Sequence, residues 1–164
     1  MLGLKVVATA SREESIAFVK KMGADYIINH REPLQKGLEA HGIAQVDHTF
    51  HTWDLDDDYL KQIVAITKVY GSIGYITSKQ GTAINPIFMK AQSLCAELMF
   101  TRLMHGVEIE KHGEILAKAQ PLFDEGKLIS NVTDVKPFSL ENVKAGLKLL
   151  KSGKAMGKVA FTHE

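Results

Sequence analysis

Apolar runs of strand length alternate with longer stretches in which apolar residues recur every three or four positions. Residues 4–10 carry a single charge and are typical of a strand that is covered on both faces of a parallel sheet. Ser11 and Glu14 have the spacing of a capping box, so we expect a helix to begin at Ser11 and to end near Gly23. Residues 25–29 predict a second strand.

The same alternation continues as far as residue 77. Residues 34–40 predict a short helix that ends near Gly42, and residues 45–51 predict a third strand. The acidic stretch 54–58 comes just before a helical apolar stripe, where the positive end of the helix dipole favours carboxylates. Metal binding by these aspartates is the alternative interpretation. Residues 71–77 predict a fourth strand.

The second half of the chain contains longer elements. Residues 96–101 predict a fifth strand and residues 108–125 a long helix, which Pro121 should kink or split. Three more elements are expected after it: an extended segment at 132–138, a helix capped by Ser139 that runs through residue 150, and a strand at 157–162. Together these elements predict an α/β fold, a doubly wound, Rossmann-like parallel sheet in a single domain over residues 1–164.

Composition and charge narrow the class of partner. A formal net charge of +1 produces a weak global field, which argues against nucleic acid and anionic membranes as partners. The sequence has no apolar run of about 18 residues, the length of a membrane span, and no signal-peptide layout at the N-terminus. The single cysteine, Cys95, excludes an internal disulfide and fits the reducing cytoplasm, where we expect the protein to act.

Dinucleotides bind at the carboxyl ends of the strands in open parallel α/β sheets. The expected strands end in side chains that carry hydroxyls, an amide, imidazoles and one guanidinium. These residues are Ser11 and Arg12 after the first strand, Asn29 and His30 after the second, Phe50, His51 and Thr52 after the third, and Thr77 and Ser78 after the fourth. This chemistry suits a nucleotide.

The end of the first expected strand bears on which dinucleotide is bound. An NAD-binding domain usually has Asp or Glu at this place to accept hydrogen bonds from the ribose hydroxyls, whereas this chain has Ala10, Ser11 and Arg12. A guanidinium beside a hydroxyl fits the 2′-phosphate of NADP, because it can donate two charge-assisted hydrogen bonds. On the local sequence alone, an equal alternative is that Ser11 only caps the helix and Arg12 is only solvated.

Other kinds of chemistry find less support in the sequence. The fingerprint G-x-G-x-x-G is absent, and neither residues 71–74 nor residues 153–158 have the spacing and context of a phosphate loop. His48 and His51 point to opposite faces of an expected strand, and no set of three or four zinc ligands is recognisable, so no metal site is predicted. We recognise no catalytic acid, base or nucleophile with a suitable partner.

Several segments in colinear order carry a resemblance to a known family. They are residues 2–12 (LGLKVVATASR), 22–30 (MGADYIINH), 98–102 (LMFTR), 124–128 (DEGKL), 137–143 (PFSLENV) and 152–159 (SGKAMGKV). With these segments the chain resembles the medium-chain dehydrogenase/reductase superfamily, and within it the quinone-reductase-like, zinc-type alcohol dehydrogenase-like branch. The resemblance covers essentially the whole chain.

The resemblance implies an NADPH-dependent oxidoreductase that transfers a hydride to or from a quinone, an enone or an alcohol. By motif, Ser11 and Arg12 would meet the 2′-phosphate, while His30 stands where relatives often have tyrosine. The remaining sites follow in order: Phe50, His51 and Thr52 along the ribose path, Thr77 and Ser78 on the nicotinamide side, and Phe100, Thr101 and Arg102 near the nicotinamide amide. No zinc ligand can be carried over.

Full-length members of the family are longer, and the resemblance places their central first strand and its Gly-rich turn before Met1. We therefore expect that the two strands on either side lack a partner between them, and that the chain alone binds NADPH poorly and has no reductase activity. The family also pairs the last strands of two sheets, which implies a homodimer through residues 98–101. The alternative function is a non-catalytic binding or dimerisation module derived from such an enzyme.

Overall fold

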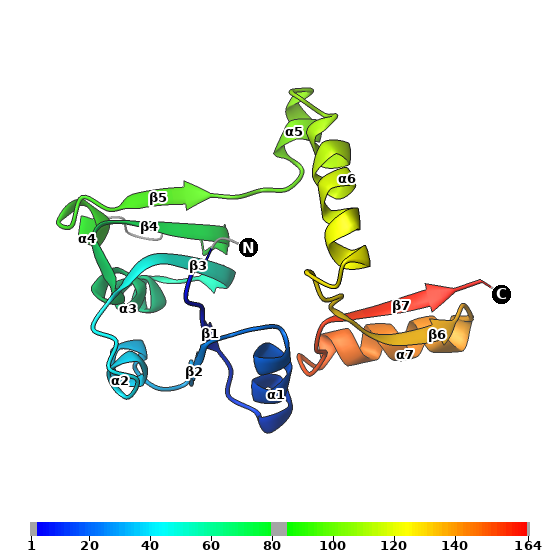
Figure 1. Cartoon of the computed structure of the whole chain (residues 1–164), viewed down its shortest axis with the longest axis horizontal. Coiled ribbons are helices and arrows are strands. Elements are labelled where there is room, and N and C mark those ends of the chain that lie inside the picture. Colours follow the sequence, from blue (N-terminus) through cyan, green and yellow to red (C-terminus); the bar gives the residue numbers. More distant parts are fainter. Residues whose placement is uncertain (1–2, 80–84, 164) are drawn as a thin grey trace. The chain divides into compact units, whose positions relative to one another are not determined.

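The computed structural model describes residues 3–79 and 85–163. These residues form two compact units, Leu4–Ile109 and a second unit that consists mainly of the residues from Glu110 onward, and each unit is described by itself. The elements of the first unit are β1 (Val7–Thr9), α1 (Glu13–Lys21), β2 (Tyr26–Ile28), α2 (Leu34–Glu39), β3 (Val46–Leu55), α3 (Asp57–Ile66), β4 (Thr67–Ser78), α4 (Asn85–Phe88), β5 (Ser93–Ala96) and α5 (Thr101–His105) (Figure 1).

The described strands of the first unit form two parallel sheets, one of β1 and β2 and one in the order β3–β4–β5. This confirms the α/β class with parallel strands. Within residues 3–79 and 85–163, β1 pairs only with β2, and β3 only with β4. Val6 and Ala10 bond to β2 at 3.1 and 2.9 Å, so the backbone groups of Val7 and Thr9 face away from it.

The core of the first unit is built on α2 and α3. Leu38 of α2 and Leu60 of α3 are each 1% exposed, and Ile73 of β4 is 0% exposed. Ile28 of β2 belongs to the same cluster, so the two helices pack against both sheets. Burying a leucine or isoleucine side chain contributes about 2 kcal/mol, which makes this cluster the main source of stability.

The C-terminal end of α3 is closed by two side chains from the segment between α4 and β5. The ammonium group of Lys90 donates to the carbonyl oxygens of Val64, Ala65 and Thr67 at 2.8, 2.9 and 2.7 Å. The amide of Gln92 donates to the carbonyl oxygens of Val64 and Thr67 as well, at 3.2 and 2.8 Å. These bonds satisfy carbonyl groups that a helix end leaves without a partner.

The second unit consists of α6 (Lys111–Asp124), β6 (Val132–Pro137), α7 (Leu140–Lys151) and β7 (Lys158–Thr162), with β6 and β7 paired in parallel. The Ser139 hydroxyl accepts from the Asn142 N–H at 3.1 Å, which confirms the predicted helix cap. Gly157 has a φ of 62°, and a Cβ placed there would lie 2.1 Å from the Asn131 carbonyl oxygen. Only glycine fits that turn.

The first helix begins later than the capping-box pattern predicted. Ser11 remains outside it, Arg12 is the N-cap residue, and α1 starts at Glu13. The hydroxyl that closes the first turn belongs to Ser15, which accepts from the Arg12 N–H at 3.1 Å and donates to the Arg12 carbonyl at 2.8 Å. The reason is that the strand hydrogen bond of Ala10 keeps the backbone extended up to the residue before Ser11.

The prediction of a fifth strand at residues 96–101 was wrong in position. β5 covers Ser93–Ala96, and its pairing with β4 ends at Ala96, after which Glu97 N–H makes a final bond of 2.9 Å to the Tyr75 carbonyl. A turn then leads into α5. The long helix predicted at 108–125 is shorter in the structure. The preceding helix, α5, ends at Gly106, which has a left-handed conformation, and α6 begins only at Lys111. Pro121 does not split α6.

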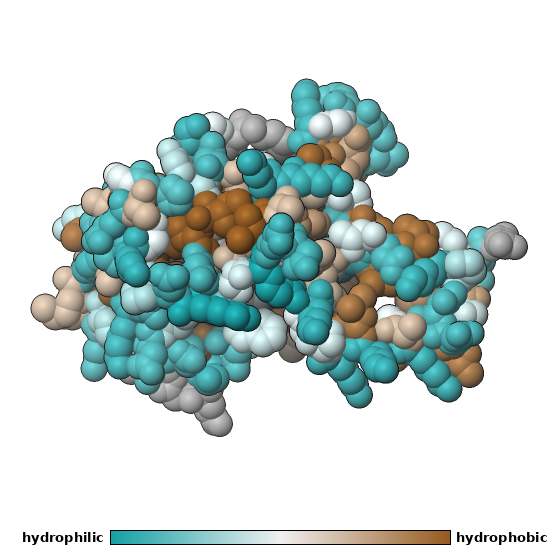
Figure 2. Space-filling model, turned by 90° about the horizontal axis from the view of Figure 1, so that it is seen from below, coloured by the Kyte–Doolittle hydropathy of each residue, from teal (hydrophilic) through white to brown (hydrophobic). Residues whose placement is uncertain are grey.

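Large apolar side chains remain exposed in both units, and Figure 2 shows them as brown patches between hydrophilic teal. In the first unit they include Phe100, Leu103 and Met104, which are 51%, 56% and 68% exposed. In the second unit Leu116 and Leu140 are 70% and 71% exposed. Exposed apolar residues in such number are typical of surfaces that contact another polypeptide segment.

Candidate functional site

Two of the predicted site residues meet at the carboxyl ends of β1 and β2. The Ser11 hydroxyl oxygen lies 3.4 Å from Nε2 of His30, although 19 positions separate them in the chain. The Ala10 N–H bonds to the Ile28 carbonyl at 2.9 Å, so both strands end at the same level. The parallel pairing of β1 with β2 therefore brings the hydroxyl and the imidazole together, as the site prediction requires.

Arg12 follows Ser11 directly and is half-buried at the first turn of α1. The backbone N–H and carbonyl of Arg12 are both hydrogen-bonded to the Ser15 hydroxyl. Arg12 is therefore a helix-cap residue as well as a candidate for anion binding. The alternative in which Ser11 caps the helix is wrong, since Ser11 lies outside α1, and the binding of a 2′-phosphate stays a prediction. Arg12 has a structural role in its backbone, and its guanidinium remains available for chemistry.

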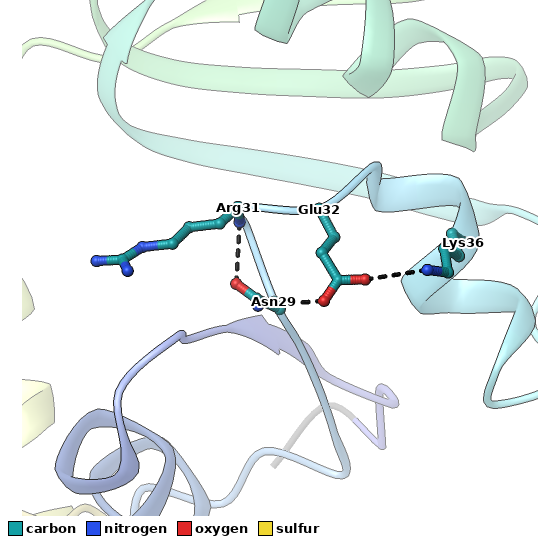
Figure 3. A network of polar contacts seen from close by, with 4 residues as sticks. All are labelled: Asn29, Arg31, Glu32 and Lys36. Atoms are coloured by element: carbon teal, nitrogen blue, oxygen red, sulfur yellow. Dashed lines mark hydrogen bonds and ion pairs between the residues drawn. The ribbon is translucent and has the colours of Figure 1, made fainter.

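Arg31 is a basic residue at this edge that the sequence analysis did not single out. The Arg31 N–H donates to the Asn29 side-chain oxygen at 3.0 Å, and the amide of Asn29 donates to Glu32 at 3.5 Å. Lys36 completes the network at 3.4 Å from Glu32. In Figure 3 the Arg31 guanidinium points away from these three side chains. In the sequence, the position of Arg31 directly after His30 could have indicated that it lies at this edge of the sheet.

The second sheet places its candidate residues differently from the prediction. β3 continues to Leu55, four residues beyond the predicted end, and β4 begins before the predicted glycine. In the register, His51 lies opposite Tyr75, while Thr77 and Ser78 lie opposite Asp54 and Leu55. The structure therefore brings Thr77 and Ser78 to the end of β3 rather than beside Phe50 and His51. Phe50 and Thr52 are exposed.

His51 has an unusual environment within β3. Its ring stacks against Tyr59 with a centroid distance of 4.8 Å, and its Nε2 atom is buried without a hydrogen-bond partner in the described residues. Burial lowers the pKa of His51, and a backbone bond to Asp54 and the carboxylates of Asp56 and Asp54 oppose this only in part.

The third group of predicted residues lies around the start of α5. Phe100 is the N-cap residue of that helix, and Thr101 is its first residue. Arg102 forms an ion pair with Glu108, a partner within the same segment. In the described part of the chain these residues make no hydrogen bond to β1, β2, β3 or β4. The structure thus leaves this group apart from the strand ends.

Metal ligation and membrane insertion can both be assessed for residues 3–79 and 85–163. In this part of the chain no three side chains among His, Cys, Asp and Glu converge on one point. The described helices are also too short or too polar to cross a bilayer. The acidic start of α3 is instead explained by capping, since Asp56 accepts from the Tyr59 N–H at 2.9 Å.

Parallel strands that alternate with helices place the chain in the class of Rossmann-like α/β domains. A family model described as zinc-binding dehydrogenase matches residues 22–160. The chain belongs to this family.

Known relatives support the same assignment. A zinc-type alcohol dehydrogenase-like protein of Staphylococcus epidermidis is 30% identical over 162 residues, which cover 97% of this chain and 48% of that protein. A solved structure described as a zinc-dependent alcohol dehydrogenase of Rhizobium etli is 32% identical with a TM-score of 0.88 over 99% of this chain and 48% of its own. A crystal structure of an NAD-dependent alcohol dehydrogenase is 25% identical with a TM-score of 0.72, and the match covers 98% of this chain and 44% of that chain. The chain spans about half the length of the curated relatives it matches.

Proposed function

We propose that this chain is the cofactor-binding portion of an NADPH-dependent oxidoreductase that transfers a hydride to or from a quinone, an enone or an alcohol. The observation that carries the proposal is the contact of Ser11 with His30, 3.4 Å apart, directly beside Arg12 at the carboxyl ends of β1 and β2. NADPH would supply the hydride to a quinone or an enone, and NADP+ would accept it from an alcohol. A hydroxyl, an imidazole and a guanidinium are the groups that recognise a ribose phosphate.

The other candidate residues are assigned to the rest of the dinucleotide by the family motif. In the proposal, Phe50, His51 and Thr52 line the ribose path, as the family motif implies. Thr77 and Ser78 lie on the nicotinamide side. The segment Phe100, Thr101 and Arg102 would approach the nicotinamide amide, as the family motif implies.

NAD is the competing cofactor, because one solved relative is described as NAD-dependent. The end of β1 argues for NADP instead. An acidic side chain that would accept from the ribose hydroxyls and repel a 2′-phosphate is replaced by Ser11 and Arg12. The family description names zinc, but no zinc ligand set is formed by the residues that the structure describes, so no step is assigned to the metal.

We propose that these 164 residues alone bind NADPH weakly and are inactive. The sequence has no G-x-G-x-x-G turn to hold the pyrophosphate, and in the described residues the edges of β1 and β3 lack a strand between them. We propose further that the chain, a single dinucleotide-binding domain, acts in the cytoplasm, where its one exposed cysteine, Cys95, would stay reduced.

The second candidate function is a non-catalytic binding or dimerisation module. It is favoured by the edge position of β5 in its sheet and by the exposed apolar residues Phe100, Leu103 and Met104 that follow. The homodimer was expected through residues 98–101, which form no strand here, so the proposed contact is instead between the β5 edges, Ser93–Ala96, of two copies. Light scattering of the full chain should give the mass of a dimer, and a monomeric mass would contradict this part of the proposal.

Cofactor choice is tested by titrating the full chain with NADPH and NADH in isothermal calorimetry or ligand-observed NMR. We expect weak binding with NADPH favoured about tenfold, and loss of that preference in Arg12→Ala, because one charge-assisted contact disappears. Lys118→Ala on the exposed face of α6 is the matched control and should bind as the unchanged protein does. Equal affinity for both cofactors would contradict the NADP assignment, and low-micromolar NADPH binding would contradict weak binding.

A further inference from the structure

The three most exposed large apolar side chains of the described residues lie on adjoining segments of the first unit. They are Phe88, Tyr70 and Met89, which are 84%, 82% and 82% exposed. The Tyr70 N–H donates to the Lys90 carbonyl at 3.0 Å, so the start of β4 lies beside the segment that follows α4 (Figure 1). Val69, which is 56% exposed, precedes Tyr70. We call Val69, Tyr70, Phe88 and Met89 the apolar patch.

A bulge in β4 carries Tyr70 out of the sheet. Val46 and His48 of β3 pair with Thr67 and Ser72 of β4, so residues 67–72 of β4 lie along only three residues of β3. The extra residues of β4 are therefore left outside the ladder of paired residues. Bulges of this kind bend a strand and redirect its side chains, and here the bulge presents Tyr70 to solvent.

The backbone at Tyr70 is strained. Its φ is 60°, a left-handed value that a bulky aromatic residue rarely adopts. Ala91, directly after the carbonyl that accepts from Tyr70, also has a positive φ, of 46°. Gly71 fixes the turn from the other side, because a Cβ placed there would lie 2.6 Å from the Asp47 carbonyl oxygen. Strained residues of this kind are concentrated at functional positions, and the exposed Tyr70 side chain repays the strain with little packing inside the unit.

Charged groups next to the apolar patch are already engaged. Lys68, one residue before Val69, forms an ion pair with Asp47 at 2.7 Å. The ammonium group of Lys90 donates to three carbonyl oxygens at the end of α3. A strongly charged partner would thus find no free lysine charge in these two residues, whereas two copies of the patch can approach each other without repulsion from them.

The size of the apolar patch matches the apolar part of a dimer interface. Since an aromatic side chain offers about 150–250 Å², the four side chains at their observed exposures offer about 500 Å² in total. A stable interface buries about 800 Å² on each copy, of which about 65%, or about 520 Å², is apolar in homodimers. Aromatic residues and methionine are also enriched at such interfaces.

We propose that the apolar patch is a self-association surface, at which two copies of this chain meet about a two-fold axis. In such a contact the same surface serves both copies, so the Tyr70 and Phe88 side chains of each copy pack on the patch of the other. Burial of the Tyr70 ring in the contact offsets the strain in its backbone.

This surface is separate from the sites described above. None of its residues belongs to β5, whose edge is proposed to pair in the homodimer. It also lies at the amino end of β4, whereas a dinucleotide is expected at the carboxyl ends of the strands. The proposal is therefore independent of the cofactor assignment.

Sedimentation equilibrium of the full chain tests the proposal. As the concentration rises through the micromolar range, the average mass should double. Phe88→Glu places a carboxylate in the contact and should weaken the association by at least about tenfold. Trp53→Glu is the matched control, because Trp53 is 78% exposed but belongs to β3, outside the apolar patch, so its association should equal that of the unchanged protein.

Tyr70→Gly is a second variant, in which backbone strain cannot prevent folding, because glycine adopts the left-handed conformation freely. It should unfold at the same or a higher urea concentration than the unchanged protein, and yet associate at least about tenfold more weakly. A residue that served only the fold would not show this combination.

Two outcomes would overturn the proposal. One is an average mass that stays constant over the concentration range, as expected if a different protein covers the apolar patch. The other is an association that Phe88→Glu and Tyr70→Gly leave unchanged, which would assign the contact to another surface. Where the β5 edges also pair, the dilute protein is already a dimer and its mass still doubles, so a doubling that both variants abolish supports the proposal in either case.

Discussion

The closure of α3 by Lys90 and Gln92 permits a quantitative test of the fold. Val64 and Thr67 each present a carbonyl that accepts from both side chains, at 2.8 and 3.2 Å for Val64 and at 2.7 and 2.8 Å for Thr67. Loss of either donor leaves the other in place. Loss of both donors leaves two carbonyls at a helix end without a side-chain partner.

The expected losses of unfolding free energy follow from this sharing of carbonyl acceptors by two donors. Lys90→Met removes a cation from the negative end of the helix, and the Ala65 carbonyl keeps a bond of 3.0 Å from Gln45, so the free energy of unfolding should fall by about 1 kcal/mol. Gln92→Met removes the bonds to the shared carbonyls, and it also removes a buried oxygen without a partner, so its cost should again be about 1 kcal/mol.

In the double variant the free energy of unfolding should fall by about 4 kcal/mol. The two single effects are about 1 kcal/mol each, and each of the two buried carbonyls that has lost both side-chain donors adds about 1 kcal/mol. Urea unfolding of the four proteins, followed by far-ultraviolet circular dichroism, measures this coupling. Lys61→Met on the exposed face of α3 is the control and should change stability by less than about 0.5 kcal/mol. Additivity within about 0.5 kcal/mol would refute the sharing of acceptors.

Three further predictions concern other parts of the chain. Burial lowers the pKa of His51, so the unfolded chain binds more protons than the folded chain. The free energy of unfolding should therefore fall as the pH drops from about 7.5 through 6.5 to the lower pKa of the folded state. In His51→Gln, urea unfolding should show a free energy that depends less on pH. Gly157→Ala should destabilise the protein by about 3 kcal/mol in thermal unfolding, because its Cβ meets Asn131, whereas Gly113→Ala in open space on α6 should stabilise it by about 0.5 kcal/mol. Ser139→Ala should cost about 1 kcal/mol of unfolding free energy, and Ser139→Asp, which keeps the cap, should cost little.

Local signals in the sequence were sufficient for much of the fold. The cap at Ser139 was predicted because a short polar side chain directly before an apolar stripe can bond to the nearby N–H groups of the helix start. Ser11 and His30 were each placed at a strand end from the sequence, and the ends of the parallel strands β1 and β2 do meet at one edge of the sheet.

Features that depend on pairing between distant segments could not be predicted from the pattern of apolar and polar residues. The register of β3 against β4 contains shifts between Val46 and His48 and between His51 and Asp54, which move Thr77 away from His51. The end of β5 at Ala96 depends on where its pairing with β4 ends, while the apolar residues that follow could equally have continued a strand.

The sequence by itself determined the class of fold and the helix start that Ser139 caps, because these depend on short-range periodicity and on residue type. The tertiary structure alone decided which of the candidate site residues meet. It joined Ser11 to His30, turned the Arg31 guanidinium away from its neighbours, and buried the Nε2 atom of His51 without a partner. The physical reason is that strand register and side-chain burial are set by contacts between segments far apart in the chain.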